Sequence, residues 1–343
     1  MGAHALYRNG ALYQVLRRWG IPFSGRPPKL RESASLVARG RRFLFPVDAV
    51  RLFLTQALSL PDKLQAAGLL RKLGSRSFAP APELTVKQWL DQESLRPNVR
   101  GLAEMLIRLS TYSNDMAALS AAAAVAQVQL GIHSGVLYLD GGWETLIEGL
   151  QAKAQAMGVI IEAGQSADSV EPGTILAIPP EEVERLTGVT LPSRTPVRAA
   201  CLDLGLQRLP KGSALFAMDL HEPLYLSVHS ASGRLAPEGS ALVHLIRYLQ
   251  PNETANREQL ESFADLLLPG WRGETLIARF LPNMIVSYAL PGPGGRAGVR
   301  VPELLGVAMA GDWVGERHML ADAAAASALE AAEFVWGKNA LAA

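Results

Sequence analysis

The sequence has little of what would identify it quickly. Its 343 residues include a single cysteine, Cys201, which excludes intrachain disulfides and a metal cluster held by several thiolates. No apolar run is long enough to span a bilayer. The amino terminus also lacks the charged and then apolar pattern of a secretory signal. We therefore expect a cytoplasmic protein.

The chain also has almost no net charge. It carries 33 basic and 32 acidic residues, a formal charge of +1. A general positive field of the kind that attracts nucleic acid is therefore absent, and we expect no nucleic-acid partner. Hydrophobic residues make up 49% of the sequence, which is enough for a large core and about two domains.

Motifs for hydrolysis or metal binding are missing too. There is no Gly-x-Ser-x-Gly turn, and Cys201 has no motif partner nearby, so a hydrolase is unsupported. His221 and Glu222 resemble the start of a zinc-binding helix, but Pro223 follows at once and His229 is eight residues from His221. The sequence therefore predicts no metal site.

The most informative stretch lies near the carboxyl end. Residues 307–310 are a short apolar run ended by Gly311, which is typical of a buried strand. Gly311 lets the backbone come close to a ligand, and Asp312 lies where open α/β sheets bind ligands. A helix made largely of Ala begins near Leu320, and its free N–H groups favour an anionic atom. The pattern predicts strand, ligand and helix without specifying the ligand.

This stretch resembles the carboxyl-terminal FAD-binding motif of the flavin-dependent amine oxidase and phytoene-desaturase-like superfamily. Further segments resemble the same family in the same order along the chain. They are residues 2–7, residues 138–150 with Gly141 and Gly142 and the end at 157–159, and residues 269–271 with 279–282.

The resemblance implies FAD as the cofactor and assigns roles around it. Asp312 would bind the ribityl or pyrophosphate part of FAD, with Gly311 beside it. Met319, Leu320 and Ala321 would place backbone N–H groups near the pyrimidine edge of the flavin, where negative charge develops on reduction. For these residues the alternative is an ordinary capped turn and helix start.

Four further residues have a role near the flavin and a plain structural alternative. Trp313 would line the flavin pocket or belong to the core. Gly141 and Gly142 would allow a close backbone approach or form a simple tight turn. His4 lies on the segment expected near the flavin ring, or is an ordinary hydrogen-bonded polar residue. The catalytic residues are not assigned.

The family's Gly-x-Gly-x-x-Gly strand–helix unit is not in the sequence. Gly292, Gly294 and Ala297 mimic its spacing, but Pro293 and the extended residues after Ala297 exclude a helix there. Family members carry this unit before the segment that residues 1–7 resemble. A late start of the gene model, a natural fragment that pairs with another chain, and a flavin-free member are the three explanations. The family's hairpin before residue 178 is also shortened, to residues 165–173.

The expected fold is α/β (α+β), with an amino-terminally truncated Rossmann-like FAD-binding domain. We assign residues 1–9, 133–195 and 300–343 to that domain. Residues 10–132 would be a helical insertion, and residues 196–299 a mixed, largely antiparallel sheet of the substrate domain. Residues 136–139 and 159–161 would be strands on either side of a helix, forming a β-turn-α-β unit.

By resemblance, the chain would oxidise a C–H or C–N bond by hydride transfer to flavin N5. The insertion is rich in apolar residues, so we expect a hydrophobic substrate, taken up at a membrane surface through peripheral contact. A helix pair packed in the core is the alternative reading of these residues, which are Leu52, Phe53, Leu54, Leu58, Leu60, Leu64, Leu69 and Leu70. The competing function is that of a flavin-free fragment that acts as a binding module or partner subunit.

Overall fold

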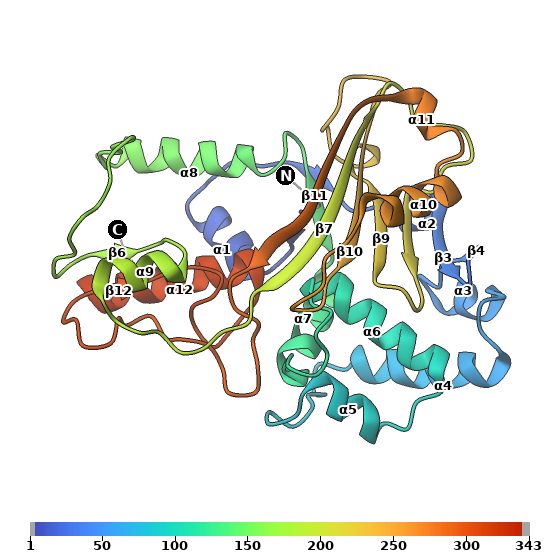
Figure 1. The fold of residues 1–343 in the computed structure, drawn as a ribbon, viewed down its shortest axis with the longest axis horizontal. Coiled ribbons are helices and arrows are strands. Elements are labelled where there is room, and N and C mark those ends of the chain that lie inside the picture. The colour runs from blue at the N-terminus through green and yellow to red at the C-terminus, as the bar shows by residue number, and fades with distance from the viewer. Residues whose placement is uncertain (1–3, 338–343) are drawn as a thin grey trace.

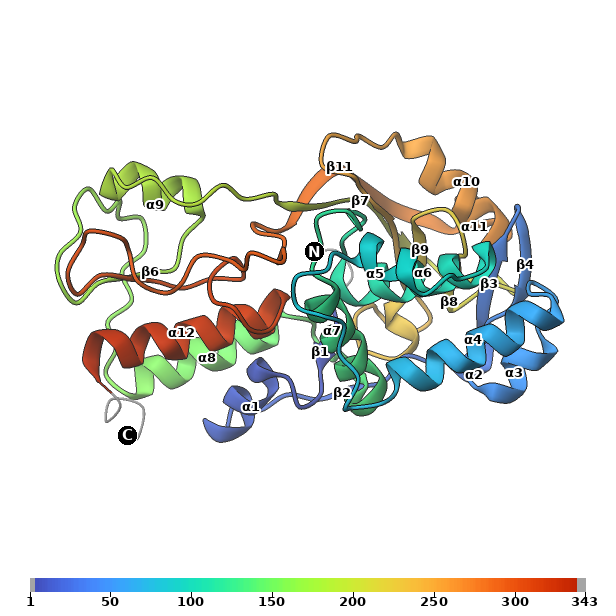
Figure 2. The same ribbon diagram turned by 90° about the horizontal axis from the view of Figure 1, so that it is seen from below.

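The computed structural model describes residues 4–337. It has a larger lobe built on a long sheet and a smaller lobe that contains the carboxyl-terminal helix (Figures 1 and 2). Residues 1–3 and 338–343, which include part of the first segment of the family resemblance, lie outside the described residues.

A seven-stranded sheet forms the centre of the larger lobe. Its strand order is β11-β7-β10-β9-β8-β3-β4. All neighbours are antiparallel except β3 and β8. The strands are β3 (Ala34–Ala38), β4 (Arg41–Leu44), β7 (Val197–Leu206), β8 (Phe216–Asp219), β9 (Leu224–Val228), β10 (Ala241–Tyr248) and β11 (Thr275–Ser287). The mixed, largely antiparallel sheet expected from the sequence is therefore confirmed.

Helices cover one face of this sheet (Figure 2). They are α2 (Leu30–Ser33), α3 (Ala49–Leu54), α4 (Leu60–Leu73), α5 (Val86–Gln92), α6 (Pro97–Thr111) and α7 (Ala121–Ser134). Their starts follow the sequence signals: Thr85 and Ser59 each form a capping box, and Pro97 opens α6. Their buried residues join Cys201 and Ile246 of the sheet in one hydrophobic core.

The opposite face of the sheet has its own core. Strand residues alternate between the two faces, so Leu202 and Leu204 of β7 point away from Cys201. They pack against α10 (Arg257–Leu267) and against Trp271, the first residue of α11 (Trp271–Glu274). A short 3₁₀ helix, η1 (His229–Ala231), follows β9.

The smaller lobe contains shorter sheets. Strand β5 (Val136–Leu139) pairs antiparallel with β1 (Leu6–Tyr7) and β2 (Gly25–Arg26), while β12 (Ala308–Met309) pairs in parallel with β6 (Ile175–Leu176). Four helices accompany these strands: α1 (Ala11–Arg18), α8 (Glu144–Ala156), α9 (Pro180–Thr187) and α12 (Leu320–Trp336). The final strand and helix predicted from the sequence are therefore present, whereas α9 was not predicted.

The predicted strand at residues 159–161 is wrong. These residues form no strand, and the side chain of Ile160 is 84% exposed. A strand needs a neighbour for its backbone groups, and no strand in the described part of the chain pairs with this run. Two apolar side chains nearby, Ile147 of α8 and Met157 directly after it, are exposed as well. The β-turn-α-β unit therefore stops after its helix.

The α/β fold class is confirmed, with a difference in how its parts combine. The hairpin β3–β4, which lies within the expected helical insertion, belongs to the sheet of residues 197–287. It pairs there because β3 is buried along its whole length and lies beside β8. The division into domains stays a prediction. Among residues 4–337, no helix combines the length and the apolar character needed to cross a bilayer.

Candidate functional site

The turn between β12 and α12 is held by the helix that follows it. The backbone N–H of Gly311 donates to Oγ of Ser327 at 3.0 Å, and that hydroxyl lies 2.9 Å from the carbonyl oxygen of Gly311. A Cβ on Gly311 would lie 2.7 Å from Nε1 of Trp313. The group that closely approaches Gly311 here is the Trp313 indole, which is buried in the core of the smaller lobe; the predicted approach to a ligand stays a prediction.

Asp312 is half-buried and turned toward β11. Burial raises the pKa of its carboxyl group, while hydrogen bonds from Ser287 and from the backbone of Tyr288 oppose the shift. Arg296 favours the ionised form by its charge. The carboxylate predicted to face a ligand is thus already bonded within the chain.

Arg296 fixes the path of the loop after Asp312. Its guanidinium donates to the carbonyl oxygens of Asp312 at 2.9 Å, Gly315 at 2.9 Å, Arg317 at 3.1 Å and His318 at 2.7 Å. These bonds reach across the whole turn from β12 to the start of α12. A single side chain therefore sets the geometry of the segment that carries the candidate residues.

The start of α12 is strained and has no side-chain cap. His318 and Leu320 have positive φ angles of 65° and 54°, which non-glycine residues rarely adopt. Met319, the residue before the helix, has no capping hydrogen bond from its side chain. Because strain of this kind tends to collect at functional sites, the first turn of α12, with Ala321, is the best-placed anion-binding element among the predicted residues.

The same turn lies at the contact between the two lobes. Met319 is buried in the core beneath the helical face of the large sheet, and Leu320 packs against that core. The small residues farther along α12 belong to the other lobe, where Ala331 is buried beside β12. The helix start therefore faces the side of the sheet on which the sequence places the substrate.

The other predicted residues form a second group. Gly141 and Gly142 have φ angles of 73° and 77° in the turn after β5, and the N–H of Gly141 donates to the carbonyl of Arg234 at 3.0 Å. His4 packs edge-on against Trp143, with ring centroids 5.4 Å apart. The glycines therefore form a tight turn against residues 233–235.

Asp322 connects α12 with α1, which follows β1. Its Oδ1 accepts the backbone N–H of Leu12 at 2.9 Å, and so stabilises the first turn of α1. Oδ2 is buried without a hydrogen-bond partner, and a Cβ on Gly10 would collide with it. The start of α12 is therefore linked to the start of α1 through a buried carboxylate. The sequence analysis did not single it out.

This carboxylate predicts a pH dependence of stability. Burial raises the pKa of Asp322 from 3.8 to about 6. The folded state thus binds the proton more tightly than the unfolded state, so this contribution is fully present below pH 4 and is lost as the pH rises through 6. We expect a loss of about 3 kcal/mol in the free energy of unfolding across this range. In Asp322→Asn, urea unfolding at a series of pH values should lack this component.

The exposed Asp168→Asn removes the same charge and serves as the control. It should keep the pH profile of the wild type between pH 4 and 6. An unchanged profile in Asp322→Asn would contradict a buried, proton-binding carboxylate.

A cavity of about 390 Å³ lies beside Trp313 and Arg296. Residues 191–195 and 289–297, which connect the lobes, supply most of its lining. The glycine-rich loop that mimics the dinucleotide spacing lies here, as a loop, with Gly292, Gly294 and Gly295 on the cavity wall. The cavity is therefore at the junction of the lobes, next to the turn that Arg296 holds.

The fold resembles several solved structures over almost the whole chain. An oxidoreductase from Methanosarcina mazei superposes with a TM-score of 0.71 at 15% identity, covering 95% of this chain and 86% of that one. Wild-type putrescine oxidase bound to putrescine gives a TM-score of 0.64 at 14% identity, covering 97% and 85%. A RAB GDI from Plasmodium falciparum gives 0.55 at 12% identity, covering 98% and 82%.

No protein-family model and no curated protein sequence matches the chain. At these low identities the structural likenesses define the fold alone. The chain therefore has the α/β fold that these oxidoreductases share, and the same fold occurs in a RAB GDI.

Proposed function

We propose that this chain is an FAD-dependent oxidoreductase that acts on a C–H or C–N bond of a hydrophobic small molecule. The observation that carries the proposal is the uncapped and strained start of α12 at the contact between the lobes. The fold likeness to oxidoreductases and the motif of Gly311 and Asp312 support it. A bound FAD would supply the hydride acceptor, its N5 atom.

The residues fit one end of the cofactor. The N–H groups of the first turn of α12 suit the anionic edge of a flavin, and Met319 and Leu320 offer apolar surface on the side of the large sheet. Arg296 would hold this turn in place through its four carbonyl contacts. The chain's own part is thus to orient the ring and keep water away from it.

The pyrophosphate end needs a strand–loop–helix unit that we propose completes the site. Support comes from residues 159–161, which are apolar, exposed and paired with no described strand, and from the exposed Ile147 of α8 and Met157, which follows α8. Such a unit would pair with the unpaired run and cover the helix. An in-frame Gly-x-Gly-x-x-Gly unit in the DNA upstream of the codon for Met1 would support this arrangement, and its absence there would oppose it.

Flavin binding is testable on the chain as it stands. Titrating FAD with the protein should quench flavin fluorescence, and Ala321→Asp should abolish the quenching. The first turn already contains Asp322, whose side chain is turned toward α1 and accepts the N–H of Leu12. A second carboxylate at residue 321 favours the helix but repels an anionic ligand. Ala328→Asp, on an exposed position farther along α12, should leave the quenching unchanged. A folded wild-type protein that causes no quenching contradicts flavin binding by the chain as it stands.

The contacts of Gly311 and Asp312 favour a second candidate function, that of a binding module without flavin. The Trp313 indole fills the space in front of Gly311, and Asp312 is bonded to β11. A chain of this kind, with the fold also found in a RAB GDI, would act as a flavin-free binding module. The fluorescence titration separates the two functions, because a binding module leaves the flavin signal unchanged.

We also propose that α3 and α4 touch a membrane surface from which the substrate is taken up. Leu52, Leu58 and Leu69 are buried, as the core alternative requires. Five other large apolar side chains on the same two helices are 45–68% exposed, namely Val50, Phe53, Leu54, Leu60 and Leu64. Exposed apolar side chains that gather on neighbouring helices are typical of interaction sites.

Membrane contact predicts co-sedimentation with anionic vesicles at low salt. The double variant Leu54→Ser, Leu60→Ser should reduce the bound fraction at least about tenfold, because each exposed leucine contributes roughly 1.5 kcal/mol or more when buried in the interface. Leu305→Ser, which changes an even more exposed leucine elsewhere on the protein, should bind as the wild type does. Wild-type protein that stays in the supernatant would rule out the membrane contact.

A further inference from the structure

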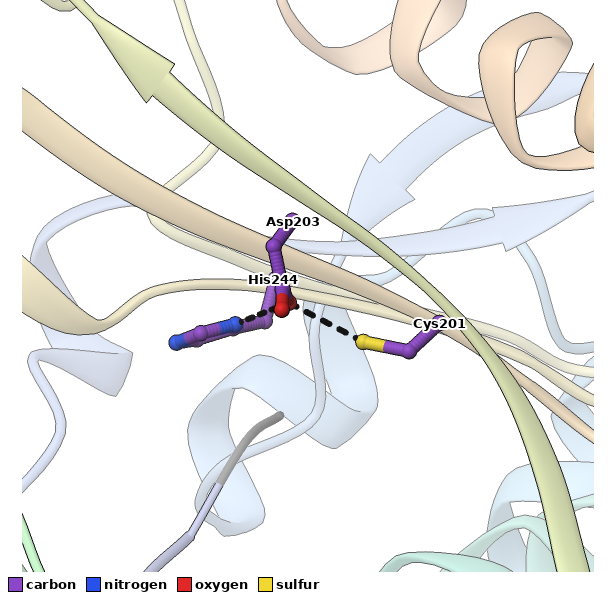
Figure 3. Close-up of side chains that lie close together, drawn as sticks. All are labelled: Cys201, Asp203 and His244. Atoms are coloured by element: carbon purple, nitrogen blue, oxygen red, sulfur yellow. Dashed lines mark hydrogen bonds and ion pairs between the residues drawn. The ribbon is translucent and has the colours of Figure 1, made fainter. Parts of the chain in front are cut away.

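Three side chains with different metal-binding atoms meet on one face of the large sheet. Cys201 and Asp203 are two residues apart on β7 and therefore point the same way, and His244 lies directly opposite Asp203 on β10. The sulfur, one carboxylate oxygen and one imidazole nitrogen all lie within 4.8 Å of one another. Figure 3 shows the thiol and the imidazole both reaching toward the carboxylate of Asp203.

The contacts within this group are short. Nδ1 of His244 lies 2.5 Å from Oδ1 of Asp203, and the thiol of Cys201 donates to the same oxygen at 3.0 Å. Ligand atoms around a tetrahedral zinc ion lie roughly 3.4–3.7 Å apart, given metal–ligand distances of about 2.0–2.3 Å. Side-chain shifts of about 1 Å would thus open a place for an ion among the three.

The group is buried and rigidly supported. Cys201 and His244 are buried, and the side chain of Asp203 is only 13% exposed. β7 and β10 are paired over eight residues, which fixes the backbone beneath all three side chains. A site on two paired strands holds its ligands more precisely than a site on loops.

A further histidine lies beside the group. His229 is 97% buried, and its ring lies near the backbone of Ser227 and of His4. It packs edge-on against the ring of His244 with centroids 4.7 Å apart, and it stacks on Tyr138. Imidazole is a common metal ligand, so His229 would border an ion held by the other three side chains.

We propose that Cys201, Asp203 and His244 form a binding site for a divalent transition metal of the zinc class, with His229 at its edge. Sulfur, nitrogen and carboxylate oxygen together are the ligand set that Zn²⁺ prefers. Ionised thiolate and carboxylate groups match the charge of the ion. The ion would link β7 to β10 and stabilise the face of the sheet toward which α12 begins. This site is independent of flavin binding.

Co²⁺ is a suitable probe because the chain has one cysteine, so any thiolate–metal signal reports on this site alone. Titration of the full-length protein should give a thiolate-to-cobalt charge-transfer band that saturates at one ion per chain, and Zn²⁺ should displace it. Cys201→Ser should lose the band. His244→Asn should weaken Co²⁺ binding at least about 100-fold.

His133→Asn changes an exposed histidine of α7 and should bind Co²⁺ as the wild type does. Circular dichroism confirms that each variant is folded, and Cys201→Ser preserves both the size of the side chain and its hydrogen bond. Absence of the charge-transfer band in the wild type, or its persistence in Cys201→Ser, would overturn the metal site.

Discussion

Replacing Arg296 by Met should lower the free energy of unfolding by about 4 kcal/mol, at about 1 kcal/mol for each of the four hydrogen bonds lost. The four carbonyl oxygens of residues 312–318 would lose their shared donor, while Met fills a similar volume. The strained backbone at His318 and Leu320 would then relax, because no other side chain in the described part of the chain makes as many hydrogen bonds to this turn. Thermal or urea unfolding measures the loss.

Arg317→Met is the matched control. It removes the same charge from the same loop and leaves the Arg317 carbonyl, which accepts from Arg296, in place. Since the Arg317 side chain is exposed, the change in stability should stay within about 0.5 kcal/mol. Equal stability losses in the two variants would show that charge, rather than the hydrogen bonds of Arg296, stabilises the loop.

The single variant Trp271→Ala should lower the free energy of unfolding by about 4 kcal/mol. The indole is 3% exposed and packs in the core between the large sheet and α10. Its Nε1 donates to Asp265 at 2.8 Å, and the Arg272 guanidinium lies 4.5 Å from the ring centroid. Differential scanning calorimetry should show a clearly lowered melting temperature.

Trp336→Ala removes an equally large side chain that is 60% exposed, and should change stability little. The comparison of these two variants also tests the role of residues 269–271, one of the segments that resemble the flavin-dependent family. Its tryptophan is a core residue of the larger lobe, so Trp271→Ala should leave the quenching of flavin fluorescence intact in whatever fraction stays folded. A selective loss of quenching would contradict this structural role.

Local signals in the sequence predicted much of the fold. The apolar strand before Gly311 and the helix beginning near Leu320 were predicted because apolar runs and helix periodicity act within a few residues. The strand at residues 159–161 was wrong because an apolar run becomes a strand only where a partner strand lies beside it. The helix α9 was not predicted, although Pro179 and Pro180 stand at its start, where proline is favoured.

The candidate site was less accessible to such reasoning. Gly311 and Asp312 could be found because they are adjacent in a recognisable pattern, but Arg296 and Asp322 act on backbone groups that are distant in sequence. The metal site escaped for the same reason. Cys201 and His244 are 43 residues apart and meet only through the register of β7 and β10, which no spacing rule in the sequence reveals.

The exposed run at residues 159–161 has a consequence for the protein in solution. Three consecutive β-branched residues that pair with no described strand are a template for the same run of another molecule, although the N–H of Val159 donates to the carbonyl of Ala154. Glu162, which follows directly, is a charged residue of the kind that limits stacking of such runs. Loss of soluble protein by pairing between two molecules is second order in the protein. The lifetime of a preparation should therefore shorten markedly as the protein concentration is raised.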